Sequence, residues 1–498
     1  MVVLEERKKM KEYPFTKDDL LAGVEKMNSF GTRPTGSPAH REFVSYLKDE
    51  IHAMGFETIS NEYKFDRWQA KSSSIVLHNP DGDSEVHVSS PFPYSGETDE
   101  NGVSGRLIRV RGKHINFAIA KDNIAVVEVK DFMHTYSGIA FDQKNAFPAG
   151  TAIPKYYKGP VASAFVKFPF LAVAAKMGVK AVICVWERMS DAMVEGQYLN
   201  FILGYQGIPA VWVNSTDGEK IIAAAEANLS ATVTLTAERE KDAETESFCS
   251  IIYGEDTNEA VVINTHTDGV NCVEENGAIA MLAMMRYFKE HKPKRTLIFV
   301  FVTGHFRLPV FKSPNGISDQ ATSLWLHDNK GLWDGRDGHM KVVAAITPEH
   351  MGCTEWKDAD GVYKKTNDID IEEVYTGNET MEKVYWECVK GRERLRTVTL
   401  KGHNFLHFGE GQPFFNVGIP EISLVTSPDY LCVESESHEM EKFDPELMYE
   451  QTLTFIRIAE YLDGLTAEEI GSADKYSLGV GRIGDEAFDL KTLIEKLK

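Results

Sequence analysis

The sequence predicts an α/β fold with a mixed, mostly parallel sheet flanked by helices. From about residue 247 onward, runs rich in Val, Ile and Phe alternate with amphipathic segments, which is typical of buried parallel strands connected by helices. Between residues 60 and 115, apolar and polar residues alternate among many turn residues, which predicts β hairpins and loops. The highly charged segment 238–246 separates the two patterns and marks the expected boundary between units.

The predicted elements follow from capping signals and from the spacing of apolar residues. Thr16, with Asp19 three residues later, predicts the start of a first helix, and Ser37-Pro38 predicts the start of a second that ends at Gly55. Further helices are expected at 171–178, from about 218, at 277–290 and at 445–461. Strands are expected at 179–183, 208–213, 260–265, 295–303, 341–346 and 421–425.

Composition excludes several classes of partner. The 498 residues include 54 Lys and Arg against 75 Asp and Glu, so the formal charge is −21. Such an acidic chain is repelled by nucleic acid and by anionic membrane surfaces, and no apolar run is long enough to span a membrane. The N-terminus lacks the apolar core of a secretory signal, and the six scattered cysteines include no CxxC pair. We therefore expect a cytoplasmic protein with reduced thiols.

The expected chemistry lies at the ends of three predicted strands, because ligand-binding residues in α/β sheets gather at the carboxyl ends of strands. Each motif alone is more common as a helix cap or a hydrogen-bonded loop histidine. Three such endings in one sheet, however, predict a functional site. The side chains concerned are those of His266, Asp268, Glu274, Glu275, His305, Glu349 and His350.

The order of motifs along the chain resembles the zinc aminopeptidase family that includes aminopeptidase Y and glutamate carboxypeptidase. The loop before the second helix, the His-x-Asp motif and the carboxylate-Asn-Gly at the next helix are each similar to family motifs. Two late motifs and the strand before His305 are also similar. The matching segments are 31–38, 266–268, 275–277, 294–301, 418–420 and 442–447.

The resemblance implies a zinc-exopeptidase-like domain with a β-rich insertion. Residues 1–70 and 246–470 would form the metallopeptidase-like domain, and residues 71–245 a protease-associated-like insertion. Gly207-Ile208-Pro209-Ala210-Val211 is similar to a segment of that inserted domain. Residues 471–498 would form a polar C-terminal tail.

The resemblance also implies a site that departs from the family pattern. His266, Glu275 and Glu349 would hold one metal ion, with Asp268 beside the first histidine. The positions of the family's paired glutamates carry His305 and Phe306, and phenylalanine cannot bind a metal. His305 would therefore act as the general base or acid, and one metal position would lack a ligand.

The expected function is a divergent metal-dependent hydrolase that cleaves an amide or peptide-like bond with one metal-activated water. Glu434, at the position of the family's last histidine, would be a pocket carboxylate. Zinc is the first choice of metal, and a carboxylate-rich set would also accept Mn²⁺ or Ca²⁺. The substrate would be a small molecule or a peptide-like compound, and the sequence is compatible with a homo-oligomer.

Two alternatives remain open at this stage. The first is a non-catalytic binding or scaffold protein whose peptidase site has decayed, as in the transferrin receptor. The second is a metal-assisted lyase that uses His305 as its base.

Overall fold

The computed structural model describes most of the chain. The residues described are 12–111, 116–130, 143–153, 159–166, 170–336, 338–359, 361–404, 407–434, 437–475, 481–483 and 486–488. Most of the predicted polar tail at 471–498 lies outside them.

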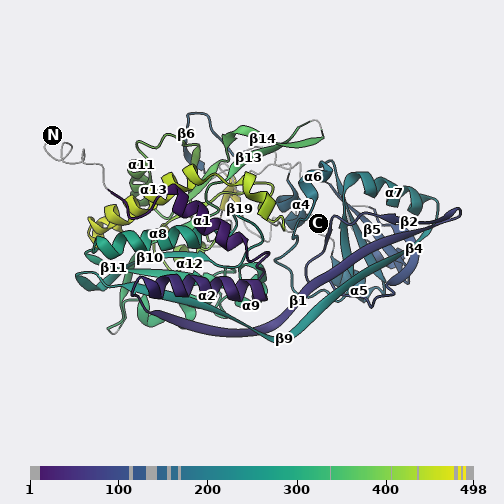
Figure 1. Cartoon of the computed structure of the whole chain (residues 1–498), viewed down its shortest axis with the longest axis horizontal. Helices are drawn as coiled ribbons and strands as arrows, with labels where there is room; N and C mark the ends of the chain where they lie inside the picture. The colour runs from purple at the N-terminus through teal and green to yellow at the C-terminus, as the bar shows by residue number, and fades with distance from the viewer. Residues whose placement is uncertain are drawn as a thin grey trace.

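The described residues form an α/β fold built on one continuous 15-stranded sheet, which confirms the predicted fold class (Figure 1). Its central strands are β10 (Asp256–His266), β11 (Arg295–Val302), β12 (Lys341–Glu349) and β17 (Glu421–Val425). β10 pairs in parallel with β11 on one side and with β12 on the other, and β12 pairs in parallel with β17. The sheet continues through β15 (Glu372–Thr376) to β16 (Thr397–Lys401).

Helices cover both faces of the central strands because successive side chains point to opposite sides of a strand. Val261 and Ile263 of β10 pack on one face, in a core shared with helices α1, α2, α8 and α13. Val262, between them, packs on the other face against α10 and α12. The bounds are α1 Lys17–Asn28, α2 Pro38–Ala53, α8 Gly277–Glu290, α10 Thr322–Asp328, α12 Gln412–Asn416 and α13 Pro445–Asp463.

The predicted helix starts are confirmed. Thr16 and Asp19 form a reciprocal capping box at α1, and the Ser37 side chain caps α2 ahead of Pro38. The Asp444 side chain caps α13 ahead of Pro445 in the same way.

Two long antiparallel strands connect this main lobe to a second lobe (Figure 1). They are β1 (Thr58–Asn79) and β9 (Ser230–Ile252), and both lobes share them. Residues 71 and 245, where the sequence analysis places the ends of the insertion, therefore fall inside continuous strands. The second lobe contains β2 (Gly82–Val86), β3 (Ser90–Pro91), β4 (Val103–Arg109), β5 (Ile124–Lys130), β7 (Ala181–Glu187), β8 (Ala210–Val213), α5 (Leu171–Lys176) and α7 (Ser215–Glu226).

The chain between these strands also returns to the main lobe. β6 (Gln143–Phe147) pairs antiparallel with β16 at the far edge of the main sheet. A second return runs from about residue 190 to residue 208, and its backbone bonds to the 432–434 segment through Tyr198 and Gly196. We call residues 190–208 the bridging loop.

The remaining elements are short or peripheral. They are η3 Phe117–Ala120, α4 Pro160–Val166, α6 Asp191–Val194, η4 His305–Arg307, α9 Leu308–Phe311, η5 Lys330–Leu332, β13 Thr354–Ala359, β14 Val362–Ile369, α11 Glu379–Cys388, η6 Ser437–Lys442, α14 Ala467–Ile470, β18 Gly481–Ile483 and β19 Glu486–Phe488. No helix in the described residues is long and apolar enough to cross a membrane. All six cysteines fall within the described ranges, where they are buried and form no disulfide.

Candidate metal centre

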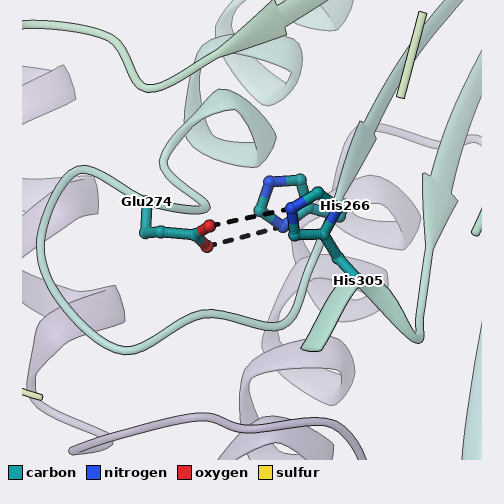
Figure 2. A group of neighbouring side chains, drawn as sticks. All are labelled: His266, Glu274 and His305. Atoms are coloured by element: carbon teal, nitrogen blue, oxygen red, sulfur yellow. Dashed lines mark ion pairs between the residues drawn. The ribbon is translucent and has the colours of Figure 1, made fainter. Parts of the chain in front are cut away.

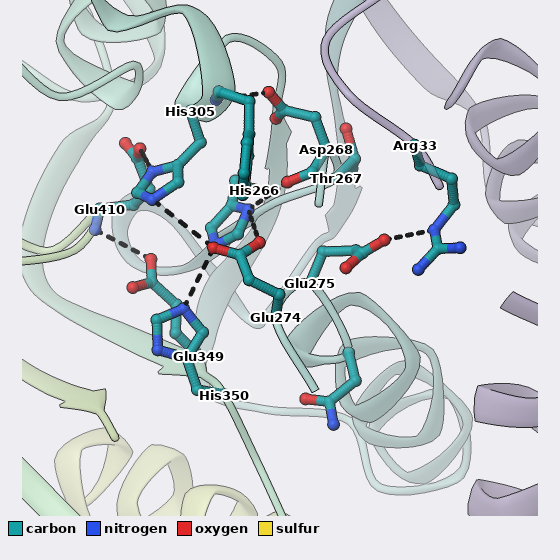
Figure 3. A network of polar contacts seen from close by, with 12 residues as sticks. Arg33, His266, Thr267, Asp268, Glu274, Glu275, His305, Glu349, His350 and Glu410 are labelled. Carbon is teal, nitrogen blue, oxygen red and sulfur yellow. Dashed lines mark hydrogen bonds and ion pairs between the residues drawn. The ribbon is translucent and has the colours of Figure 1, made fainter. Parts of the chain in front are cut away.

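A cluster of histidines and glutamates lies where three parallel strands end (Figure 3). His266 is the last residue of β10, and Glu349 is the last residue of β12. His350 follows Glu349 with a positive φ of 52°, and this left-handed backbone is uncommon outside glycine and typical of functional turns. His305 follows β11 after Gly304. Because the three strands are neighbours and parallel, their ends bring these side chains together.

Hydrogen bonds at the Nδ1 atoms fix the orientation of two of the imidazoles. His266 Nδ1 lies 2.8 Å from the backbone oxygen of Asp268, and His350 Nδ1 lies 2.7 Å from that of Thr426. A carbonyl oxygen only accepts, so each Nδ1 carries the proton and each Nε2 of the neutral ring keeps its lone pair. Both Nε2 atoms are buried and have no hydrogen-bond partner. This is the arrangement of a histidine prepared to bind a metal.

Glu274 faces all three imidazoles (Figure 2 shows two of them). Its Oε2 lies 3.7 Å from His266 Nδ1, and its Oε1 lies 3.9 Å from His305 Nε2 and 3.7 Å from His350 Nε2. Glu274 Oε2 has no hydrogen-bond partner, although the side chain is buried. Glu349 Oε2 is buried and unpartnered as well. A Cβ atom on Gly409 would collide with this Glu349 carboxylate, so only glycine fits at that position.

The described residues contain two groups whose ligand atoms lie within 4.8 Å of one another. One is His266, Glu274 and His305, and the other is His266, Glu349 and His350. Both groups need His266, whose single lone pair can bind one ion. The cluster therefore offers one well-supplied metal position.

Burial and crowding shift the pKa values across the cluster. Burial, with Glu275, Asp268 and Glu349 nearby, raises the pKa of Glu274 well above its usual value. Burial also raises the pKa of Glu349 to about 8 and lowers that of His350 to about 3. Burial and two neighbouring imidazoles lower the pKa of His266. Without a cation these carboxylates repel one another, and a divalent ion would relieve that repulsion.

His305 differs from the other two histidines because a carboxylate holds it. Its Nδ1 lies 2.6 Å from Glu410 Oε1, and its ring stacks on that of His266 with centroids 4.0 Å apart. Glu410 also accepts from the backbone N–H groups of Ala321 and Thr322 at the start of α10. Burial disfavours the imidazolium, but the Glu410 carboxylate outweighs burial and raises the pKa of His305. His305 and Glu410 therefore form a buried imidazole–carboxylate pair.

Glu275, which the sequence analysis expects as a metal ligand, is paired with Arg33. The guanidinium of Arg33 contacts Glu275 Oε1, and both side chains are fully buried. The other oxygen of Glu275, Oε2, is buried and has no hydrogen-bond partner. The neighbouring Glu274 faces the imidazoles.

Asp268 supports the loop that carries His305 rather than the ring of His266. Its carboxylate accepts from the backbone N–H groups of Gly304 and Phe306, and from the hydroxyl of Thr35. His266 is oriented by the backbone oxygen of Asp268, not by its carboxylate. The Asp268 carboxylate therefore holds the loop that carries His305 and is not itself one of the candidate ligands.

Phe306 and Glu434 both contact the bridging loop. The ring of Phe306 stacks on Phe201 with centroids 4.6 Å apart and contacts Tyr198 at 5.7 Å. Glu434 bonds through its backbone to Gly196, and burial raises the pKa of its carboxyl to about 7. The described contacts of Glu434 do not include a ligand atom of the cluster.

The sequence analysis places Glu274 and His350 at the strand ends without giving either a role, and it does not single out Glu410. Glu274 and His350 each stand next to a residue that was chosen, so sequence spacing alone could not decide which of the pair turns inward. Glu410 lies far from the three strand ends in sequence, and its one signal is its position between Gly409 and Gly411. Close approach of the backbone explains both glycines, because a Cβ atom on Gly411 would meet Ser423.

Solved structures with the same fold include aminopeptidases and a further peptidase. An aminopeptidase from Aneurinibacillus sp. strain AM-1 is similar at a TM-score of 0.58 and 15% identity, covering 90% of this chain and 93% of that one. A zinc aminopeptidase from Bacillus subtilis is similar at a TM-score of 0.59 and 15% identity, covering 91% and 96%. A peptidase M28 precursor from Shewanella amazonensis is similar at a TM-score of 0.60 and 14% identity, covering 90% and 97%.

The chain has the fold of these aminopeptidases. No family model matches its sequence, and no curated protein matches it. The similarity therefore shows the fold alone. The roles of the clustered His and Glu side chains have to be judged from their own geometry.

Proposed function

We propose that this protein is a metal-dependent hydrolase that cleaves an amide or peptide-like bond. The observation that carries the proposal is the convergence of four buried, unpartnered atoms at the strand ends, namely Nε2 of His266 and His350 and Oε2 of Glu274 and Glu349. Buried polar atoms are nearly always hydrogen-bonded, so four exceptions in one cluster need a common explanation. A divalent cation held by His266, Glu349 and His350, with Glu274 facing it, would account for them. The zinc aminopeptidase with the same fold supports this choice of chemistry.

The donor set fits zinc best. His266, Glu349 and His350 would hold the ion, with Glu274 facing it, and imidazole nitrogen with carboxylate oxygen is a ligand set that zinc accepts. Mn²⁺ also accepts it, whereas Ca²⁺ prefers six to eight oxygen ligands. When bound, the ion supplies a Lewis acid that polarises the scissile carbonyl and activates water.

His305 and Glu410 would move the proton. Nδ1 of His305 is committed to Glu410, so its Nε2, which faces Glu274, is the nitrogen that can take a proton from water and return it to the leaving amine. Glu410 stabilises the imidazolium that forms in between. His305 Nε2 is also within reach of the cluster as a ligand, and experiment can separate the two roles.

The second lobe would contribute to the substrate site. Phe201 of the bridging loop lies 6.0 Å from the His305 ring, so this lobe approaches the reacting centre directly. We propose that it corresponds to a protease-associated-like insertion, and that the protein acts on a small peptide-like substrate in a reducing compartment.

Metal analysis of the wild-type protein, together with one variant, tests the proposal. The purified protein should retain about one metal equivalent after dialysis, on the ligand count of a catalytic site, and should hydrolyse aminoacyl or acylated amino acid amides. His305→Ala should keep the metal and lower turnover by roughly a hundredfold or more.

Other outcomes would change the assignment. If His305→Ala loses metal and activity together, His305 is a ligand. If the wild-type protein binds no metal, the proposal fails and a non-catalytic role on the same fold takes its place.

A further inference from the structure

Arg307 is a buried arginine at the boundary between the two lobes. It follows Phe306 in the short helical turn η4 (His305–Arg307), and the residue is only 6% exposed. Its guanidinium lies 3.7 Å from the centroid of the Tyr94 ring, and its Nη1 donates to the backbone oxygen of Leu203 at 3.0 Å. Both contacts come from the second lobe. His305 faces the metal cluster, and Arg307, from the same turn, faces the second lobe.

Arg307 differs from the other buried arginines in having no carboxylate partner. In the described part of the chain, four arginine residues are less than 9% exposed, and three of them pair with a glutamate. Arg33 pairs with Glu275, Arg67 with Glu240 at 2.8 Å, and Arg295 with Glu259 at 2.8 Å. No carboxylate of the described residues pairs with Arg307, and its Nε is buried without any partner.

An unpaired buried cation is costly, and no carboxylate of the described residues balances the charge of Arg307. Guanidinium has to be desolvated on burial, and the ring of Tyr94 with one carbonyl oxygen compensates only in part. A planar guanidinium whose Nε has no partner matches a carboxylate in shape and charge. The net charge of −21 would otherwise repel an anionic substrate, so a local cation is needed to hold one.

From these contacts we infer that Arg307 binds a carboxylate of the substrate. The substrate would then be a short peptide or acylated amino acid whose carboxylate reaches the lobe boundary while its amide lies at His305. This inference rests on the proposed hydrolase function for its substrate class. Recognition of the carboxylate itself depends only on Arg307 and can be measured without turnover.

Binding of three small probes to the metal-loaded protein tests the inference. N-acetylalanine carries an α-carboxylate, N-acetylalaninamide carries none, and the α-amide of N-acetylglutamic acid carries a side-chain carboxylate. Calorimetry should show that the wild-type protein binds one of the two carboxylate probes about ten- to a hundredfold more tightly than N-acetylalaninamide, as expected for a charge-assisted pair. The preferred carboxylate probe identifies which group of the substrate Arg307 holds.

Two matched variants separate recognition from structure. Arg307→Met should abolish the preference for the carboxylate probe and leave the melting temperature unchanged or raised, because it removes an uncompensated buried cation. Arg67→Met removes a paired arginine of similar burial, so it should lower the melting temperature and keep the preference.

The outcomes are distinguishable from those of the hydrolase proposal. If wild-type protein does not prefer either carboxylate probe, or if Arg307→Met keeps the preference, the inference is wrong even where hydrolysis is observed. If the preference depends on Arg307 but no amide is hydrolysed, the carboxylate site stands and the hydrolase proposal fails.

Discussion

Two buried charge clusters in the main lobe can be compared, and they differ in how their carboxylate oxygens are satisfied. In the first, at the ends of β10, β11 and β12, two imidazole nitrogens and two carboxylate oxygens have no partner. In the second, Glu372 of β15 accepts from Arg392, from Gln451 at 2.7 Å and from the Tyr385 hydroxyl. Arg392 Nη2 also donates to the backbone oxygen of Arg394 at 2.9 Å.

The difference supports the proposed metal-binding role for the first cluster and a structural role for the second. Both clusters are buried and both contain carboxylates, so burial of charge does not by itself indicate chemistry. The Glu372 network uses both carboxylate oxygens within the chain, as a structural ion pair must. The strand-end cluster leaves ligand atoms unused and therefore needs a group from outside. The predictions that follow test this contrast.

The largest effect is expected for His266→Ala. This change removes the imidazole common to both ligand groups, so bound metal should fall from about one equivalent to near zero, together with all hydrolytic activity. Elemental analysis after dialysis measures the loss. His327→Ala, at a histidine near the surface, is the control and should keep both properties. Retention of metal by His266→Ala would show that the strand-end cluster is not the metal site.

Arg392→Met should lower stability and keep the bound metal, whereas His266→Ala should lose the metal. The loss of Arg392 leaves Glu372 buried without its cation, and the free energy of unfolding should fall by about 3–5 kcal/mol while metal content stays the same. Denaturant titration of the metal-loaded protein measures the change. The double variant Arg392→Met/Glu372→Gln should recover part of the loss, because no uncompensated charge then remains. If Arg392→Met lost its bound metal, the two clusters could not be assigned separate roles, one in metal binding and one in stability.

A smaller effect is expected for Glu410→Gln. The amide still reaches His305 Nδ1 but no longer stabilises the imidazolium, so turnover should fall by about 10- to 100-fold, a common effect of outer-shell partners. Steady-state kinetics at fixed metal concentration measures this. Glu355→Gln, which alters a paired carboxylate away from the cluster, serves as the comparison and should leave turnover unchanged.

The most gradual effect, spread over several pH units, concerns the pH dependence of stability. Burial, with Asp370 nearby, raises the pKa of Glu373 to about 8, so the folded chain binds a proton there that the unfolded chain releases near pH 4.5. Stability from this group is therefore fully present below pH 4.5 and is lost as the pH rises toward 8, with a slope of at most about 1.4 kcal/mol per pH unit. Glu373→Gln should flatten the decline in unfolding free energy between pH 5 and 8. An unchanged decline would mean that Glu373 is ionised in the folded state.

Much of the fold could be predicted from the sequence because its signals are local. The apolar runs 260–265 and 295–303 predict buried strands, and they fall in β10 and β11. Thr16, Ser37 and Asp444 cap their helices through neighbouring backbone groups. The second lobe was harder, because β1 and β9 are continuous through both lobes and their burial pattern changes along each strand. When the boundary between two lobes falls inside a continuous strand, the sequence contains no linker segment that marks it.

The site could be predicted only in outline. Strand order brings His266, His305 and Glu349 together, and the sequence identifies all three. Which of two adjacent carboxylates faces the cluster depends on Arg33, which lies 242 residues from Glu275 in the chain. The choice of Glu410 as the partner of His305 depends on how the segment before α12 passes over β12 and β17. Tertiary contacts of this kind have no periodic signature in a sequence.

The pairing of β6 with β16 has a consequence for the second lobe as a unit. β16 would be the outermost strand of the main sheet if residues 143–147 did not cover it, and an uncovered edge of this kind is a template for aggregation. The second lobe is therefore not a removable module, since excising it between β1 and β9 would expose that edge. Its partners are also about 250 residues apart in the chain, so closure of this edge belongs to the slow, non-local steps of folding. A chain without the second lobe could still form the main sheet, but the uncovered edge of β16 could then pair with other copies of the chain.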